Sequence, residues 1–243
     1  MKIRGSVALV TGANRGLGKV FAAALIAGGA HKVYAAARDP GKIENAKLHS
    51  IRLDITNRSD VAAAAERCPD VTLLVNNAGI IRFAPLIASV GMDEARDEME
   101  TNYFGTLAMC RAFAPILGKN GGGAIVNVLS VASWVNVPMQ GSYSASKAAE
   151  LSLTNGIRIE LEEQGTQVLA VHAGYVDTDM AAHIDVPKSQ ASDVVDRTLE
   201  GLEAGSKEVL ADERSREIRS ALIHHPETID AMLAGMWQAR RRS

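Results

Sequence analysis

The stretch "TGANRGLG" (residues 11–18) decides the fold, because it joins the apolar run "SVALVT" (6–11) to an alanine-rich segment that begins at residue 16. Gly12, Gly16 and Gly18 fall in this junction. Glycine permits a tight turn and lets the backbone approach a ligand closely. A helix that starts here offers free N–H groups and a positive dipole end to a pyrophosphate. The spacing is not GxGxxG, so a plain tight turn between a strand and a helix remains the alternative.

Outward from this junction, short β-branched runs alternate with longer alanine- and leucine-rich ones. Several of the short runs are apolar almost throughout, as strands covered on both faces must be. The alternation predicts an α/β protein with a parallel seven-stranded sheet and helices on both faces. No linker or repeat interrupts residues 1–243, so we expect one domain with a C-terminal helical extension at about 212–243. Predicted strands cover 6–11, 32–37, 49–53, 71–76, 124–129, 167–172 and 207–211, and predicted helices cover 16–28, 58–67, 91–118, 143–163 and 190–204.

The composition narrows the functional classes. Apolar residues make up 47% of the 243 residues and charged residues 22%, which is ordinary for a soluble globular protein. A net charge of −2 gives no electrostatic argument for nucleic acid or an anionic membrane, and the basic C-terminal "QARRRS" is expected to be a solvated helix end. Cys68 and Cys110 have no metal or redox spacing, so no metal site is expected. The run "VALV" is too short for a secretory signal, and we expect a cytoplasmic protein.

Ligands of an open parallel sheet bind beyond the carboxyl ends of its strands. The second predicted strand ends in "AAARDP", with Arg38 near the place where an NAD site usually has an acidic residue. An arginine suits the 2′-phosphate of NADP, and Arg15 in the glycine stretch can reach the same group. The alternative is that both arginines are solvated surface charges. The third strand ends at Asp54 and the fourth in "NNAG" (76–79), which alone are common turn residues.

The segment "GSYSASKAAE" (141–150) carries Tyr143 and Lys147 four residues apart, on one face of a helix. A lysine charge favours the phenolate, so we expect the pKa of Tyr143 to fall from about 10 towards neutrality. Such a tyrosine can act as a general acid or base. An ordinary helical neighbourhood is the alternative. Ser130 ends the fifth strand thirteen residues before Tyr143 and can meet it, while Ser133 is a competing serine that the pattern does not separate from Ser130.

The motifs "TGANRGLG", "DIT", "NNAG", Asn102, Ser130 and "YSASK" occur in a familiar order and spacing. Over about residues 5–211 the chain resembles the short-chain dehydrogenase/reductase family of the single-domain type. The resemblance implies a Rossmann-like, doubly wound sheet and an NADP(H)-dependent oxidoreductase that interconverts a carbonyl and an alcohol by hydride transfer. A homodimer or homotetramer is expected, although residues 212–243 lack the glycine-rich end that often packs a tetramer interface.

The resemblance also implies the catalytic groups. Ser130 would orient the substrate oxygen, and Tyr143 would donate or accept its proton. Lys147 would lower the pKa of Tyr143 and bind the nicotinamide ribose. Asn102, inside the predicted helix 91–118, would hold a water in a proton relay to Lys147. Asparagine is a poor helix former, which fits a functional reason for this position.

By the same resemblance, the cofactor lies along the strand ends. Asp54 would bind the adenine amino group, and the turn "HAGYVDTDM" (172–180) would hold the nicotinamide amide. The expected cofactor-binding residues are Gly12, Asn14, Arg15, Gly16, Leu17, Gly18, Arg38, Asp54, Ile55, Asn76, Ala78, Gly79, Tyr143, Lys147, Gly174, Val176 and Thr178.

The candidate substrate pocket is mostly apolar, which indicates a small or medium-sized hydrophobic ketone or aldehyde, although each apolar residue can instead be core packing. The short segment 179–190 stands where many members of the family insert a lid, so we expect an open pocket. The pocket candidates are Ile81, Phe83, Ser130, Trp134, Val137, Met139, Tyr175 and Met180.

Two other functions fit the sequence less well. An extended-type epimerase or dehydratase usually has a TGxxGxxG loop and a larger C-terminal substrate region, and this chain has neither. A non-catalytic NADP-binding sensor tends to lose the tyrosine or the lysine, and both are present here. The physiological substrate cannot be read from the sequence.

Overall fold

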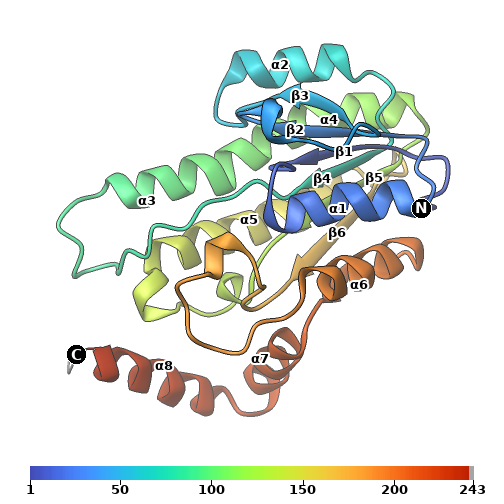
Figure 1. Ribbon diagram of the computed structural model, residues 1–243. Helices are drawn as coiled ribbons and strands as arrows, with labels where there is room; N and C mark the ends of the chain where they lie inside the picture. Colours follow the sequence, from blue (N-terminus) through green and yellow to red (C-terminus); the bar gives the residue numbers. More distant parts are fainter. Residues whose placement is uncertain (241–243) are drawn as a thin grey trace.

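A seven-stranded parallel sheet forms the centre of the computed structural model, which describes residues 1–240. The strand order is β3-β2-β1-β4-β5-β6-β7, so the order reverses between β1 and β4 (Figure 1). This confirms the predicted Rossmann-like, doubly wound architecture. The strands are β1 (Val7–Thr11), β2 (Lys32–Ala37), β3 (His49–Arg52), β4 (Leu73–Asn76), β5 (Ala124–Val128), β6 (Gln167–His172) and β7 (Glu208–Leu210).

Helices cover both faces of the sheet and give it two hydrophobic cores. On one face, Phe21 and Leu25 of α1 (Gly16–Ala27) and Val194 of α6 (Ala191–Glu203) pack against the strands. On the other face lie α2 (Arg58–Arg67), α4 (Thr106–Lys119) and α5 (Gly141–Glu160), with Phe113 of α4 fully buried. Double coverage explains why β1 and β4 are buried at every position, as their apolar sequences predict.

The predicted helix over 91–118 is not regular. The structure divides it into α3 (Asp93–Glu98), a π-helical turn η2 (Met99–Gly105) and α4. A π-helical turn holds an extra residue, which leaves no mark in the hydrophobic period of the sequence and is frequent at functional sites. Asn102 lies in this turn and is fully buried.

Two C-terminal helices, α7 (Glu213–His224) and α8 (Pro226–Arg240), pack against the segment that joins β5 to α5. Ile218 of α7 and Ile229 of α8 are buried against Val135 and Val137. Figure 1 shows α7 and α8 on the far side of α6 from the sheet, with α8 running beneath the start of α5. The last two helices therefore support the chain between Ser130 and Tyr143. We call this contact the C-terminal cluster.

No helix among residues 1–240 is long and apolar enough to cross a membrane. The cytoplasmic location expected from the sequence stays a prediction. The last three residues of the basic "QARRRS" end, 241–243, lie outside the described residues.

The C-terminal cluster allows a matched stability test on one helix. Ile218→Ala removes a side chain that is 3% exposed, whereas Ile223→Ala removes one that is 63% exposed. Truncating a buried isoleucine costs about 2–4 kcal/mol, and a surface change usually stays within about 0.5 kcal/mol. We expect Ile218→Ala alone to lower the urea midpoint, followed by circular dichroism. Equal midpoints for the two variants would mean that α7 is not docked in solution.

Candidate functional site

The site lies where the strand order reverses, at the carboxyl ends of β1 and β4. Thr11, the last residue of β1, is 1% exposed, and its hydroxyl accepts hydrogen bonds from the backbone N–H groups of Asn77 and Ala78, both at 3.0 Å. The Asn77 amide donates back to the Thr11 carbonyl at 2.9 Å. These bonds fix the "NNAG" segment against the start of the glycine loop, at the strand-end edge where ligands of an open parallel sheet bind; we call this edge the crevice.

The glycine loop has the geometry of a phosphate-binding turn. Gly12 and Gly16 have φ values of 66° and 51°, which side-chain-bearing residues rarely adopt. A Cβ added at Gly18 would lie 2.3 Å from the Gly12 carbonyl oxygen and 2.5 Å from the Asn77 amide nitrogen. No side chain caps the N-terminus of α1, so its first N–H groups remain open to an anion. The loop therefore fits the pyrophosphate of a dinucleotide.

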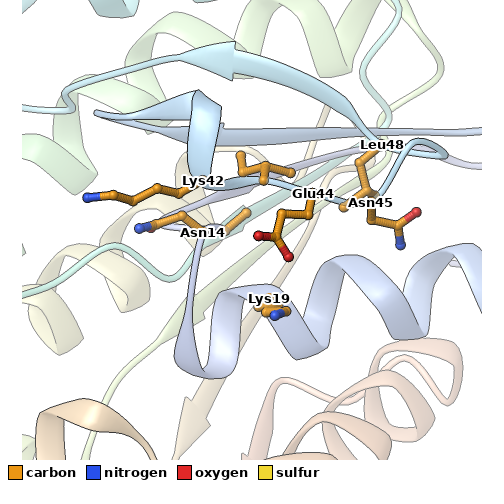
Figure 2. Close-up of a pocket in the computed structure, with 8 residues that line it drawn as sticks. Asn14, Lys19, Lys42, Glu44, Asn45 and Leu48 are labelled. Carbon is orange, nitrogen blue, oxygen red and sulfur yellow. The ribbon is translucent and has the colours of Figure 1, made fainter.

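A pocket of about 280 Å³ adjoins this loop (Figure 2). Asn14 of the loop, Lys19 of α1 and Lys42 line it, together with Glu44 and its neighbours after β2. Sequence reasoning missed Lys42 and Lys19. Lys42 stands four residues beyond Arg38 in "RDPGK", a spacing that could have indicated a second cation at this strand end.

The two predicted phosphate arginines lie near the surface. Arg38 directly follows β2 and is exposed, with no ion-pair partner among residues 1–240. Arg15 has a loose ion pair with Asp179 at 3.8 Å, in which both side chains are about two-thirds exposed. Arg15 therefore bridges the glycine loop and the segment after β6, and an arriving phosphate would compete with Asp179 for it.

Other predicted cofactor residues differ in what they expose. The Asn76 amide points into the sheet, where it donates to Asn127 at 2.9 Å, so only its backbone can face a cofactor. Ile55 packs against Gly105 inside the protein. The carboxylate of Asp54 accepts hydrogen bonds from the backbone and hydroxyl of Thr56 but is itself half-buried at the surface.

Gly79 links the cofactor crevice to the Tyr143–Lys147 pair. A Cβ added at Gly79 would lie 3.7 Å from the Lys147 amine and 3.1 Å from Oδ1 of Asn102. A side chain here would fill the space beside the amine. The crevice therefore reaches Lys147.

Ser130 and Tyr143 meet in the structure, as the thirteen-residue spacing allows. The Ser130 hydroxyl lies close enough to the Tyr143 phenol to lower the pKa of that phenol. The competing Ser133 is engaged elsewhere: its hydroxyl donates to the Ser130 carbonyl at 2.6 Å and lies 3.1 Å from Nδ1 of His172. The geometry thus separates two serines that the sequence pattern left equivalent.

Lys147 has an unexpected partner. Its amine donates to the carbonyl of Val128, at the end of β5, at 2.9 Å and to the carboxylate of Glu150 at 2.6 Å. It also lies 6.0 Å from the centre of the Tyr143 ring. Burial is the largest single influence and lowers the pKa of Lys147, but Glu150 and Tyr143 together outweigh burial and hold that pKa above its usual value. Sequence reasoning did not single out Glu150.

The prediction that Tyr143 has a lowered pKa is wrong. Burial raises the pKa of Tyr143 above its usual value and outweighs the Lys147 charge and the Ser130 hydrogen bond, which both lower it. The charges of Glu150 and Glu98 add to the rise. The four-residue spacing predicts the direction of the lysine's effect correctly, but it holds no information on burial or on the second charge.

The side-chain amide of Asn102 is engaged by protein groups and is not free to bind a water. Its Oδ1 accepts from the Ile80 N–H, and its Nδ2 donates to the Ile80 carbonyl and the Ser146 hydroxyl, all at 2.9 Å. The side chain therefore ties η2 to the "NNAG" loop and to α5. A water relay at this residue would have to use the main-chain carbonyl.

The turn after β6 approaches the crevice from the opposite side. The Gly174 N–H donates to the Asp212 carboxylate at 2.7 Å, so it is not free for the expected nicotinamide contact. Val176 forms an isolated bridge with Ser189, and Thr178 lies beside Gly16 of the glycine loop. The turn thus lies against the glycine loop at Thr178.

Two aromatic contacts border the expected substrate pocket. Phe83 has a φ of 54°, rare for a side-chain-bearing residue, and its ring meets His183 edge-on at 4.5 Å. Trp134 stacks on the buried His172 at 4.0 Å, and the Arg219 guanidinium lies 5.1 Å from the Trp134 ring centre.

The remaining pocket candidates are placed as follows. Ile81 is half-buried near Phe83, the Tyr175 hydroxyl accepts a hydrogen bond from Gln140 at 3.0 Å, and Met180 is 44% exposed. Met139 is half-buried in the turn before α5. Val137 belongs to the C-terminal cluster, so packing accounts for its side chain.

Comparison with known proteins gives a consistent result. The family model described as short chain dehydrogenase matches residues 6–189. A crystal structure of a short chain dehydrogenase from Burkholderia cenocepacia J2315, in complex with NADP, has a TM-score of 0.92 and 44% sequence identity, and the match covers 96% of this chain and 99% of that one.

Curated proteins match over similar regions. The 3-oxoacyl-[acyl-carrier-protein] reductase FabG of Vibrio harveyi is 32% identical over 234 residues, which is 92% of this chain and 90% of that protein. Dehydrogenase/reductase SDR family member 7B of Bos taurus is 28% identical over 81% of this chain. The chain spans 66%, or just under two thirds, of that relative's length.

The close approach at Gly18 predicts a loss of nucleotide binding. In Gly18→Ala the added Cβ would meet the Gly12 carbonyl oxygen at 2.3 Å, so the loop must shift. We expect at least about a tenfold weaker affinity for a nicotinamide dinucleotide, measured by titration calorimetry. Gly156→Ala on α5 is the control, because its Cβ would meet nothing within 4 Å. Wild-type affinity in Gly18→Ala would show that the loop does not need this contact.

Proposed function

The chain belongs to the short-chain dehydrogenase/reductase family, and from this premise we propose that it is an NADP(H)-dependent oxidoreductase that interconverts a carbonyl compound and an alcohol. The observation that carries the proposal is the convergence of Ser130, Tyr143 and Lys147 beside the crevice at Gly79. An acid–base tyrosine, a hydroxyl donor and a buried cation are the groups that polar reduction of a carbonyl needs.

The bound cofactor supplies the hydride for the carbonyl carbon. Ser130 donates a hydrogen bond to the carbonyl oxygen, and Tyr143 gives that oxygen its phenolic proton as negative charge develops there. The Lys147 ammonium stabilises the tyrosinate that is left behind, and it would also hold the nicotinamide ribose of a bound cofactor. Oxidation of the alcohol follows the same path in reverse, with the tyrosinate as the base. A water relay that returns the proton would start from the main-chain carbonyl of Asn102.

The preference for NADP rests on the charge at the end of β2. Arg38 is exposed and unpaired by any residue of 1–240, and Lys42 lines the adjoining pocket together with Asn14. No acidic residue stands at position 37 or 38, where an NAD site would use one. The NADP complex of the Burkholderia cenocepacia structure supports the same choice.

A hydrophobic ketone or aldehyde is the substrate class that the surrounding residues favour. Three of the pocket candidates, Phe83, Trp134 and Tyr175, are aromatic, and none of the candidates is charged. The similarity to an enzyme named as a 3-oxoacyl reductase supports a keto substrate. The expected homodimer or homotetramer stays a prediction.

The role of Tyr143 has a direct test. Tyr143→Phe removes the phenolic proton and keeps the ring, so carbonyl reduction should fall by at least about 10²-fold, because general acid catalysis contributes about 10²–10⁴-fold. The measurement is kcat with NADPH over a panel of ketones and aldehydes, with NADPH affinity followed separately. Tyr103→Phe on η2 is the matched control and should keep turnover within about twofold. More than about a tenth of wild-type turnover in Tyr143→Phe would contradict the assignment.

The cofactor choice has a second test. Ala37 is only 4% exposed, so an acid placed there would bury a carboxylate, and Arg38→Leu is the cleaner change. A charge-assisted bond is worth about 1.5–3 kcal/mol, and exposure puts Arg38 at the lower end of that range. Arg38→Leu should lower kcat/KM for NADPH about tenfold and Arg38→Leu with Arg15→Ala about a hundredfold, while NADH is hardly affected.

The control for cofactor choice is Arg67→Leu. Arg67 is an exposed arginine at the C-terminal end of α2, and its replacement should leave kcat/KM for NADPH and for NADH unchanged. Ionic strength must be fixed, because salt screens these contacts. If the wild type uses NADH as well as NADPH, the NADP preference is wrong and the carbonyl–alcohol chemistry is untouched.

A further inference from the structure

Glu150 is a buried acid that the proposed chemistry does not use. It follows Lys147 by three residues on α5, its side chain is 2% exposed, and one carboxylate oxygen lies 2.6 Å from the lysine amine. The other oxygen lies 3.5 Å from the Thr106 hydroxyl at the start of α4. An ion pair at this depth is weak evidence for stability, because desolvation of both charges opposes their attraction. A stabilising role therefore does not by itself explain why Glu150 lies next to Lys147.

The Lys147 amine uses two of its N–H groups inside the protein and has one left for a ligand. An ammonium has three N–H donors, and Val128 and Glu150 take two of them. The third is left for the crevice, where an added Cβ at Gly79 would come within 3.7 Å of the amine. Glu150 therefore fixes the direction of the amine. Burial raises the pKa of the Glu150 carboxyl and the Lys147 charge opposes that rise. As a carboxylate, Glu150 also cancels part of the field that the ammonium exerts on Tyr143.

The other titratable groups around α5 do not replace Glu150. Cys110 of α4 lies near the carboxylate, but burial raises the pKa of its thiol to about 12, so the thiol is neutral at physiological pH. Glu98 of α3 is buried and adds a smaller negative influence on Tyr143 than Glu150 does. Tyr103 of η2 is half-buried, and His172 of β6 contacts the Ser130 carbonyl. The remaining charged residues of α3 and η2 are exposed: Asp93, Glu94, Arg96, Asp97 and Glu100.

We propose that Glu150 is a positioning residue that holds the Lys147 ammonium and weakens its field at Tyr143, which keeps Tyr143 protonated and favours carbonyl reduction over alcohol oxidation near neutral pH. The proposal rests on the proposed function for its direction of reaction, because reduction needs the phenol and oxidation needs the phenolate. Removal of the Glu150 charge leaves the ammonium uncompensated, so the phenolate forms at lower pH. Removal of the Lys147 charge has the opposite effect.

The test compares Glu150→Gln with Lys147→Met and the wild type. Ultraviolet difference titration against Tyr143→Phe in each background isolates the ionisation of Tyr143 and needs no turnover. We expect the midpoint to fall by about one pH unit in Glu150→Gln and to rise in Lys147→Met. The pH profile of alcohol oxidation should move to lower pH in Glu150→Gln, with about a tenfold gain in kcat at pH 7, because one unit is a tenfold change in phenolate.

Two controls separate this role from a structural one. Thr154→Val lies on α5 one turn beyond Glu150 and is equally buried, so it should lower stability but leave the Tyr143 midpoint in place. Glu150→Asp keeps the charge and should keep the midpoint near the wild-type value. A Glu150→Gln protein that is less stable but titrates like the wild type would overturn the proposal.

The remaining outcomes are also decisive. If Glu150→Gln does not fold, Glu150→Met, which removes the charge at a similar side-chain volume, replaces it, and a Tyr143 midpoint that stays at the wild-type value contradicts a weakened lysine field. If no carbonyl is reduced, the proposed function fails, while the titration still reports on Glu150.

Discussion

The hydrogen bonds between Thr11 and the Asn77–Ala78 backbone are the constraint on which the rest of the site depends. They join the ends of β1 and β4, the two strands between which the order of the sheet reverses. Val10 and Val75 are paired in register, so Thr11 and Asn76 end their strands at the same level. The glycine loop on one side and Gly79 on the other then have fixed positions. Asn102 of η2 is tied to Ile80 beside this edge, and Thr178 of the turn after β6 lies beside Gly16 of the glycine loop.

The charged residues around that edge differ in exposure, so solvent screens the charges at one end of the crevice more than those at the other. Arg15 and Arg38 are exposed, so water and salt weaken their attraction for a phosphate. Lys147 and Glu150 are buried, and their mutual attraction is barely screened. The exposed end thus suits reversible binding of a charged ligand, because the screened attraction is weak enough to allow its release. The buried end suits control of one proton, because small changes in charge there alter the ionisation of Tyr143.

Much of this could be predicted from the sequence, and the failures have physical causes. Apolar strands and glycine-bearing strand ends are local sequence patterns, so the sheet and the position of the crevice can be predicted from the sequence. Burial is not local, which is why the direction of the Tyr143 pKa was wrong. Glu150 was the nearest miss, because positions 143, 147 and 150 share one helical face and that spacing is visible in "YSASKAAE". The stack of Trp134 on His172 and the π-helical turn at Asn102 join distant segments and leave no periodic signal.

The C-terminal cluster has a consequence for how the enzyme is made. Ile218 and Ile229 are synthesised after the segment between Ser130 and Tyr143, yet they bury Val135 and Val137 in that segment. A chain emerging from the ribosome N-terminus first can form β1 to β6 and the glycine loop while that segment is still uncovered. The segment between Ser130 and Tyr143 therefore reaches its final packing only after α7 and α8 have been synthesised.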